Sequence, residues 1–310
     1  MRRIQLADNL EALRTLDDGL ADLIYIDPPF NTGRERRHEQ IRVVQSDTGA
    51  RTGFAGRRYD AATIGSHSFA DCFDDYLAFL EPRLAEGWRV LADDGTLYVH
   101  LDWRESHYVK VLLDAMVGRE RFLNEIIWAY DYGGRTKKRW PPKHDVILVY
   151  VKDPKRYTFN ADAVDRIPYM APGLVGAEKA ALGKLPTDTW WHTIVPTNSR
   201  EKTGYPTQKP LGILRRIVAA SSDPGDLVLD FFAGSGTTGA ACLELGREFI
   251  LIDESPGAME VMAKRFEGVP GASEIEWVGR SPAGATAPSD AMLPEVVVRS
   301  DSDRERHRSP

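Results

Sequence analysis

Asp27, Pro28, Pro29 and Phe30 directly follow an apolar run at residues 22–26, where a buried strand would end. This combination suits the activation of an aromatic amine, which is a poor nucleophile because its lone pair is delocalised into the ring. The Asp27 carboxylate and the Pro28 carbonyl can each accept a hydrogen bond from such an amine, and the prolines fix the backbone beforehand. Phe30 offers a face on which a flat base can stack. A simple strand-ending turn is the alternative, because Asp-Pro is common in turns.

A glycine-rich turn with the spacing G-x-G-x-x-G occupies residues 234–239, between a predicted strand and a predicted helix. Gly234 and Gly236 allow a sharp turn and a close approach of a ligand to the backbone. Asp253 ends the next predicted strand, where an acid can accept hydrogen bonds from both ribose hydroxyls. Asp230 ends the preceding strand and is placed to point into the same crevice. The motif fits NAD, FAD or S-adenosylmethionine, it is not a P-loop, and a turn without a ligand is the alternative.

Three motifs together resemble the amino-group DNA methyltransferases, the N6-adenine and N4-cytosine enzymes, in their permuted "beta" order. DPPF at 27–30 comes first, TQKP at 207–210 follows, and F-x-G-x-G at 232–236 comes last. The resemblance covers most of residues 4–266. It implies transfer of a methyl group from S-adenosylmethionine to the exocyclic amine of a flipped base in duplex DNA. Asp as the first residue of the catalytic motif favours N6 of adenine, and N4 of cytosine stays the alternative.

The resemblance also implies a role for each matching residue. The catalytic set is Asp27, Pro28, Pro29 and Phe30. The cofactor-binding set, to which Asp230 is added from its strand position, is Asp8, Lys209, Asp230, Phe232, Gly234, Gly236, Thr237 and Asp253. In this set Lys209 is expected near the methionine end of the cofactor and Asp253 at the ribose. Asp8 matches the acid that contacts the cofactor adenine, although Ala7 replaces the glycine that usually precedes it.

Short apolar runs predict the strands that position these residues. They lie at 4–6, 22–26, 96–101, 124–130, 146–152, 227–231 and 249–252. The alternation of strands and helices in the second half indicates a parallel sheet with helices packed on it. The predicted fold is therefore α/β. The resemblance makes it the Rossmann-like, circularly permuted sheet of S-adenosylmethionine-dependent methyltransferases, with about seven mostly parallel strands and a last antiparallel one.

Composition divides the chain into parts. Residues 1–152 form the half with DPPF, in which the Gly-, Arg- and Ser-rich 31–67 segment is expected to be a mobile loop. Residues 153–204, rich in Pro and Gly, are expected to form a small inserted target-recognition region. Residues 205–268 complete the first domain with its cofactor-binding half. Residues 269–310 are expected to form a flexible tail.

Basic residues gather in one part of an acidic chain. The formal net charge is −6, yet residues 134–156 hold eight Lys and Arg against two acidic residues. Arg135, Lys137, Lys138 and Arg139 are therefore candidate contacts to the phosphates of double-stranded DNA. A solvated charged face explains the charge equally well. Trp190 and Trp191 could stack on bases, although packing in a small core is the commoner use of such residues.

Several classes of protein are excluded or disfavoured by composition. The 310 residues, 42% apolar and 28% charged, are typical of a soluble globular chain. Two distant cysteines exclude a disulfide scaffold, and the histidines lack metal-binding spacing, so no catalytic metal is expected. No membrane-spanning run or signal peptide is evident, so we expect a cytoplasmic protein. A homodimer and a cognate restriction endonuclease are further candidate partners.

Three other functions stay open at this point. Methylation of RNA or protein usually accompanies Asn-Pro-Pro-Tyr/Phe and the unpermuted order, which Asp27 and the late glycine turn disfavour. An NAD-type oxidoreductase would use the glycine turn but would leave DPPF unexplained. A catalytically silent DNA-binding module would bind the cofactor without turnover.

Overall fold

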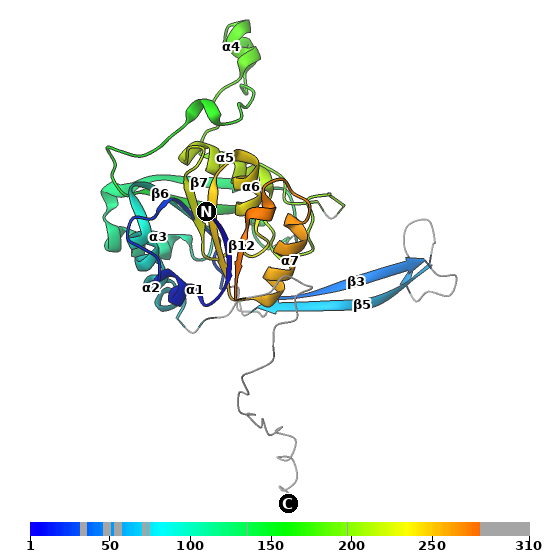
Figure 1. Cartoon of the computed structure of the whole chain (residues 1–310). Helices are drawn as coiled ribbons and strands as arrows, with labels where there is room; N and C mark the ends of the chain where they lie inside the picture. The colour runs from blue at the N-terminus through cyan, green and yellow to red at the C-terminus, as the bar shows by residue number, and fades with distance from the viewer. Residues whose placement is uncertain are drawn as a thin grey trace, which may run out of the picture. The chain divides into compact units, whose positions relative to one another are not determined.

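The main sheet is flanked by helices (Figure 1). It has nine strands in the order β12-β1-β11-β10-β2-β6-β8-β7-β9. The computed structural model describes residues 1–31, 36–45, 51–52, 58–69, 73, 75–134, 136–196 and 198–279, and within 36–69 it describes the backbone alone. In sheet order the strands are Glu276–Val278, Arg2–Leu6, Glu248–Asp253, Leu227–Asp230, Ala21–Ile26, Leu91–Asp102, His144–Val151, Phe122–Ala129 and Thr189–Trp191. Every neighbouring pair is parallel except the two that involve β8.

The predicted α/β class with a mixed, mostly parallel sheet is confirmed. The seven predicted strands occupy the central positions, and the short strands β12 and β9 extend the two edges, so the sheet has nine strands rather than about seven. The antiparallel strand is not the last one. The crossover through α3 (Ser106–Val117) leaves a position open between β6 and β7, and β8 turns back after β7 to fill it.

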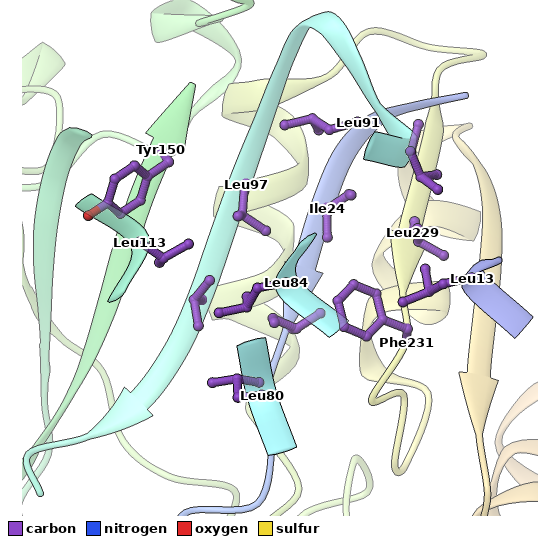
Figure 2. Close-up of a cluster of buried hydrophobic side chains, with 14 of the residues drawn as sticks. Leu13, Ile24, Leu80, Leu84, Leu91, Leu97, Leu113, Tyr150, Leu229 and Phe231 are labelled. Carbon is purple, nitrogen blue, oxygen red and sulfur yellow. The ribbon is translucent and has the colours of Figure 1, made fainter. Parts of the chain in front are cut away.

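Helices cover both faces of the sheet and bury an apolar layer on each. On one face α1 (Asn9–Leu13), α2 (Tyr76–Val90) and α3 pack against the strands, and Figure 2 shows Leu80, Leu84 and Ile24 within this layer. On the other face lie α5 (Leu211–Ser221), α6 (Thr237–Leu245) and α7 (Pro256–Phe266). Because the central strands are covered on both sides, their sequences are almost continuously apolar. Each fully buried leucine stabilises the fold by roughly 1.5–3 kcal/mol.

The prediction that 31–67 forms a loop is wrong for much of that segment, which contains strands. Strand β3 (Arg36–Gln45) pairs antiparallel with β5 (Arg58–Phe69), and β4 (Arg51–Thr52) pairs with β5, giving a separate three-stranded sheet. An antiparallel ladder depends on backbone hydrogen bonds, which polar sequences also form. Runs such as RRHEQIRVVQ carry little apolar alternation, so periodicity did not reveal them.

Two other segments differ from expectation. The 153–204 segment contains short helices, among them α4 (Ala177–Leu182), and its strand β9 belongs to the main sheet. Residues 269–279, predicted as the start of a flexible tail, contain a 3-10 turn at Ala272–Glu274 and strand β12. The rest of the predicted tail, 280–310, lies outside the described residues. None of the described helices is long and apolar enough to cross a membrane.

Candidate active site

The DPPF segment and the glycine turn line one cleft. DPPF follows β2 and the glycine turn follows β10, and these strands are parallel neighbours, so their carboxyl ends meet at one rim of the sheet. In open parallel sheets this rim is where ligands bind. The predicted residues that line the cleft are Asp27, Pro28, Pro29, Phe30, Lys209, Asp230, Phe232, Gly234, Thr237 and Asp253.

The two oxygens of Asp27 have different surroundings. Oδ2 lies 2.5 Å from the Lys209 ammonium, in an ion pair whose side chains are 8% and 17% exposed. Oδ1 is buried and has no hydrogen-bond partner among the described residues. A buried acceptor without a partner is unfavourable, so this oxygen is free to receive a donor from a ligand. The Lys209 ammonium also lies 4.7 Å from the centroid of the Phe30 ring, so Lys209 contacts the DPPF motif at two of its residues.

A buried polar network lies next to Phe30, and the sequence did not indicate it. The His100 imidazole lies 6.2 Å from the Phe30 ring, is fully buried, and contacts the Tyr25 hydroxyl at 2.8 Å and Asp145 at 3.1 Å. Tyr130 donates a hydrogen bond of 2.9 Å to the other oxygen of Asp145. Burial opposes the charge of Asp145, but the bonds from His100 and Tyr130 and the positive charge of Lys209 hold its pKa below the usual value. The network fixes the floor of the cleft across β2, β6, β8 and the end of β7.

The glycine turn is held in a conformation that only glycine adopts easily. Gly234 has φ +50° and Gly236 has φ +72°. The Gly234 N–H donates a 2.8 Å hydrogen bond to Asp253, whose second oxygen accepts one from the Ser255 N–H at 2.8 Å. Burial raises the pKa of Asp253 to about 6. Asp253 therefore joins the turn after β10 to the turn after β11 and still faces the cleft.

Asp230 lies in the cleft wall, and both of its oxygens are occupied. One accepts a 3.0 Å hydrogen bond from the Phe232 N–H, and the other accepts one of 2.5 Å from the Thr238 hydroxyl. Burial raises its pKa to about 7. These bonds tie the strand end to the start of α6, so the geometry favours a turn-holding role over the predicted contact to a cofactor.

Asp8 was expected at the cofactor, but it is not among the residues that line the cleft. Its carboxylate caps α1 through the Glu11 N–H and forms a 3.0 Å ion pair with Arg83. The neighbouring Asn9, which the sequence did not indicate, lines the cleft instead. Asn9 donates a 2.8 Å hydrogen bond to the Phe231 carbonyl and accepts one of 2.6 Å from Arg83.

The predicted DNA contacts lie outside the cleft lining. Lys137, Lys138 and Arg139 are exposed on the connection between β7 and β8, and Arg135 falls outside the described residues. Trp190 is buried and packs in the core, whereas Trp191 is 79% exposed. In the described part of the chain, no group of His, Cys, Asp and Glu side chains is arranged to hold a metal ion.

Fold and cleft thus define a Rossmann-like α/β protein in which the DPPF motif adjoins a glycine-rich turn at one rim of the sheet. The chain matches the family model N6_N4_Mtase, described as DNA methylase, over residues 21–265. It therefore belongs to this family of DNA methylases.

Individual relatives agree with this assignment. The chain is 30% identical over 266 residues to the type II methyltransferase M.HpaI of Haemophilus parainfluenzae, covering 86% of this chain and 74% of that protein. It is 30% identical over 273 residues to the DNA adenine methyltransferase YhdJ of Escherichia coli (strain K12), covering 84% and 81%.

Solved structures share the fold. The M1.HpyAVI–SAM complex superposes with a TM-score of 0.54 at 22% identity, over 86% of this chain and 98% of that chain. The cytosine-N4-specific PvuII DNA methyltransferase superposes with a TM-score of 0.59 at 15% identity, over 90% and 95%.

Proposed function

We propose that this protein transfers the methyl group of S-adenosylmethionine to the exocyclic amine of a base flipped out of duplex DNA, and that this amine is N6 of adenine. Membership of the DNA methylase family and the relative named as a DNA adenine methyltransferase support this proposal. The observation that carries it is the buried, unpartnered Oδ1 of Asp27 in the cleft that also holds the glycine turn.

The residues of the glycine turn fit S-adenosylmethionine. A Cβ atom added at Gly234 would lie 3.1 Å from the Tyr205 ring, so glycine preserves space at the cleft wall. Asp253 has acceptor capacity left for ribose hydroxyls after its two backbone bonds. Phe232, Gly234, Thr237 and Asp253 would hold the cofactor, which supplies an electrophilic methyl group on its sulfonium.

The catalytic motif would prepare the amine. Oδ1 of Asp27 accepts one amine hydrogen and the Pro28 carbonyl accepts the other, which favours a tetrahedral nitrogen with its lone pair out of the ring plane. Lys209 fixes the carboxylate through Oδ2, and Phe30 stacks on the base. Positioning and preorganised electrostatics of this kind supply most of the rate enhancement.

Transfer of tritiated methyl from S-adenosylmethionine to mixed-sequence DNA is the direct test. Asp27→Ala should abolish transfer and leave cofactor binding intact, and Asp17→Ala, at an exposed carboxylate, is the control. Sequencing of modified bases in host DNA, with and without the protein, gives both the base and the site. N4-methylcytosine would identify the alternative acceptor, and no transfer by the unaltered protein to any DNA would refute the proposal.

Four parts of the proposal concern the regions that contact DNA and the partners of the protein. We assign target recognition to the 153–204 segment, and we expect phosphate contacts from Lys137, Lys138 and Arg139. A cognate endonuclease and a homodimer remain predictions. The endonuclease is tested by asking whether host extract cuts DNA at the recognition site when that site is unmethylated. The homodimer is tested by measuring the mass of the protein in solution.

A further inference from the structure

Trp140 is an exposed aromatic residue in the most basic connection of the chain. Its side chain is 95% exposed. The connection between β7 and β8, residues 130–143, contains Arg135, Lys137, Lys138, Arg139 and Lys143 against the single acid Asp131. Such charge attracts a polyanion, and an indole surrounded by cations is suited to stacking on nucleic-acid bases.

A chain of contacts connects this region to the catalytic motif. The Arg139 guanidinium lies 5.4 Å from the Trp103 ring centroid, and Arg104 packs on the same ring at 5.5 Å. Glu105, next along the chain, accepts a 2.9 Å hydrogen bond from Asn31, which directly follows Phe30. Since β7 is oriented in the same direction as β2, the connection also leaves the sheet at the DPPF rim.

The base of the connection is held firmly. The Tyr130 N–H donates a 2.9 Å hydrogen bond to the Lys143 carbonyl, and the Lys143 ammonium donates bonds of 2.6 Å and 3.0 Å to the carbonyls of Tyr132 and Gly133. Pro141 and Pro142 follow Trp140 and restrict the backbone on its C-terminal side. The indole is therefore presented to solvent from a constrained backbone, which lowers the entropy lost when it binds.

We propose that Trp140 is a wedge that enters the duplex at the position vacated by the flipped base. Flipping breaks a base pair and two stacking contacts, and an aromatic side chain of similar size restores stacking for the bases that remain. The neighbouring Lys137 and Lys138 contact phosphates and hold the wedge in register. This inference rests on the proposed function, and it assigns to Trp140 the task of keeping the target base out of the duplex.

The test uses two duplexes that carry the methylated site found by sequencing. In one the target base is paired, and in the other it lies opposite an abasic position, so no pair has to be broken. Trp140→Ala should lower kcat/KM on the paired duplex by about tenfold or more and on the abasic duplex by less than about twofold. Trp140→Phe should restore most of the loss. With 2-aminopurine at the target position, the fluorescence rise on binding should be smaller for Trp140→Ala than for the unaltered protein.

Lys138→Ala is the matched control for a phosphate contact. It should weaken binding equally on both duplexes and reduce the salt dependence of log K by about one unit. An equal loss on both duplexes for Trp140→Ala, or no loss at all, would overturn the wedge while leaving the proposed function standing. If the unaltered protein methylates neither duplex, the proposed function itself fails.

Discussion

The Lys209 ammonium lies 2.5 Å from a carboxylate oxygen of Asp27, although 182 residues separate the two in sequence. Lys209 lies just before α5, and Asp27 directly follows β2. The pair therefore joins the 205–268 segment to the DPPF motif. Oδ2 is occupied by Lys209, whereas the buried Oδ1 has no hydrogen-bond partner among the described residues.

Lys209→Met tests whether Lys209 positions Asp27. The substitution removes the charge, so the carboxylate loses its fixed orientation, and kcat should fall about 100-fold, the effect expected from a small misplacement of a reacting group. The dissociation constant for S-adenosylmethionine, measured by calorimetry, should stay unchanged. Lys264→Met, at an exposed lysine on α7, serves as the control. A large loss of cofactor affinity with unaltered kcat would instead support the sequence prediction that Lys209 contacts the methionine end.

Asp253→Ala should weaken cofactor binding. The change removes the carboxylate that accepts hydrogen bonds from the Gly234 and Ser255 N–H groups, and with it any bond to a ribose. Because hydrogen bonds to a charged group are lost, the dissociation constant for S-adenosylmethionine should rise about tenfold or more. Asp253→Asn keeps one acceptor oxygen and should lose less. Calorimetric titration with S-adenosylmethionine measures both, with Glu267→Ala on the exposed surface as the control. Unchanged affinity in Asp253→Ala would show that the ribose is held elsewhere.

The central sheet was predictable from sequence because its strands are buried on both faces and are continuously apolar. The motifs were predictable for the same reason, since Asp27 and Gly234 each follow such a run and the ends of parallel strands share one rim. Strands β9 and β12, each of three residues, are too short to leave a periodic pattern, and β3 and β5 are too polar.

The polar partners of the site were not predictable, since they come together only in the folded sheet. His100 and Asp145 lie 45 residues apart on strands that pair antiparallel, and neither belongs to a recognisable motif. The position of Asp8 outside the cleft lining was not predictable, because sequence does not show that Arg83, on a helix 75 residues later, binds its carboxylate beside Asn9. A buried His or Asp at the rim end of a predicted strand is the one signal that could have indicated the network.

Asp230→Asn should change the pH dependence of stability. Burial raises the pKa of Asp230 from 3.8 to about 7, so the folded protein keeps a proton that the unfolded chain has lost. The free energy of unfolding of the unaltered protein should therefore fall as pH rises from about 4 to about 7, and level off above that. Asparagine has no proton to release, so the variant should lose the contribution of Asp230 to this decline, on the order of 3 kcal/mol, and keep the smaller contribution of Asp253.

Urea denaturation at about pH 4.5 and about pH 8 measures this difference. Asp17→Asn, at an exposed carboxylate, should leave the decline unchanged. Parallel curves for Asp230→Asn and the unaltered protein would show that Asp230 is ionised in the folded state throughout this range.

Gly236 and Gly246 lie at the two ends of α6, and comparing Gly236→Ala with Gly246→Ala separates the cost of backbone strain from the cost of steric contact. The glycines have nearly the same left-handed conformation, with φ +72° and φ +71°, so alanine costs about 1 kcal/mol of backbone strain at either. An added Cβ at Gly236 would lie 2.7 Å from Met262 Cγ, whereas one at Gly246 has no neighbour within 4 Å. Gly236→Ala should therefore lower the free energy of unfolding by about 1–3 kcal/mol more than Gly246→Ala.

Met262→Ala provides the decisive comparison for this pair. Truncating Met262 leaves a space beside Gly236, and the nearest remaining neighbour of an added Cβ is Phe266 Cε2 at 3.3 Å. Adding Gly236→Ala to Met262→Ala should therefore cost little more than the backbone strain that Gly246→Ala shows. Urea unfolding of the two single variants and the double variant gives the coupling energy between the positions. Because Met262 packs from α7 against the turn that lines the cleft, strong coupling would mean that α7 sets how closely the glycine turn can approach a ligand. If the losses in the free energy of unfolding for the two single variants add up to that of the double variant, the Met262 side chain moves aside at little cost. Left-handed backbone geometry alone would then require glycine at position 236.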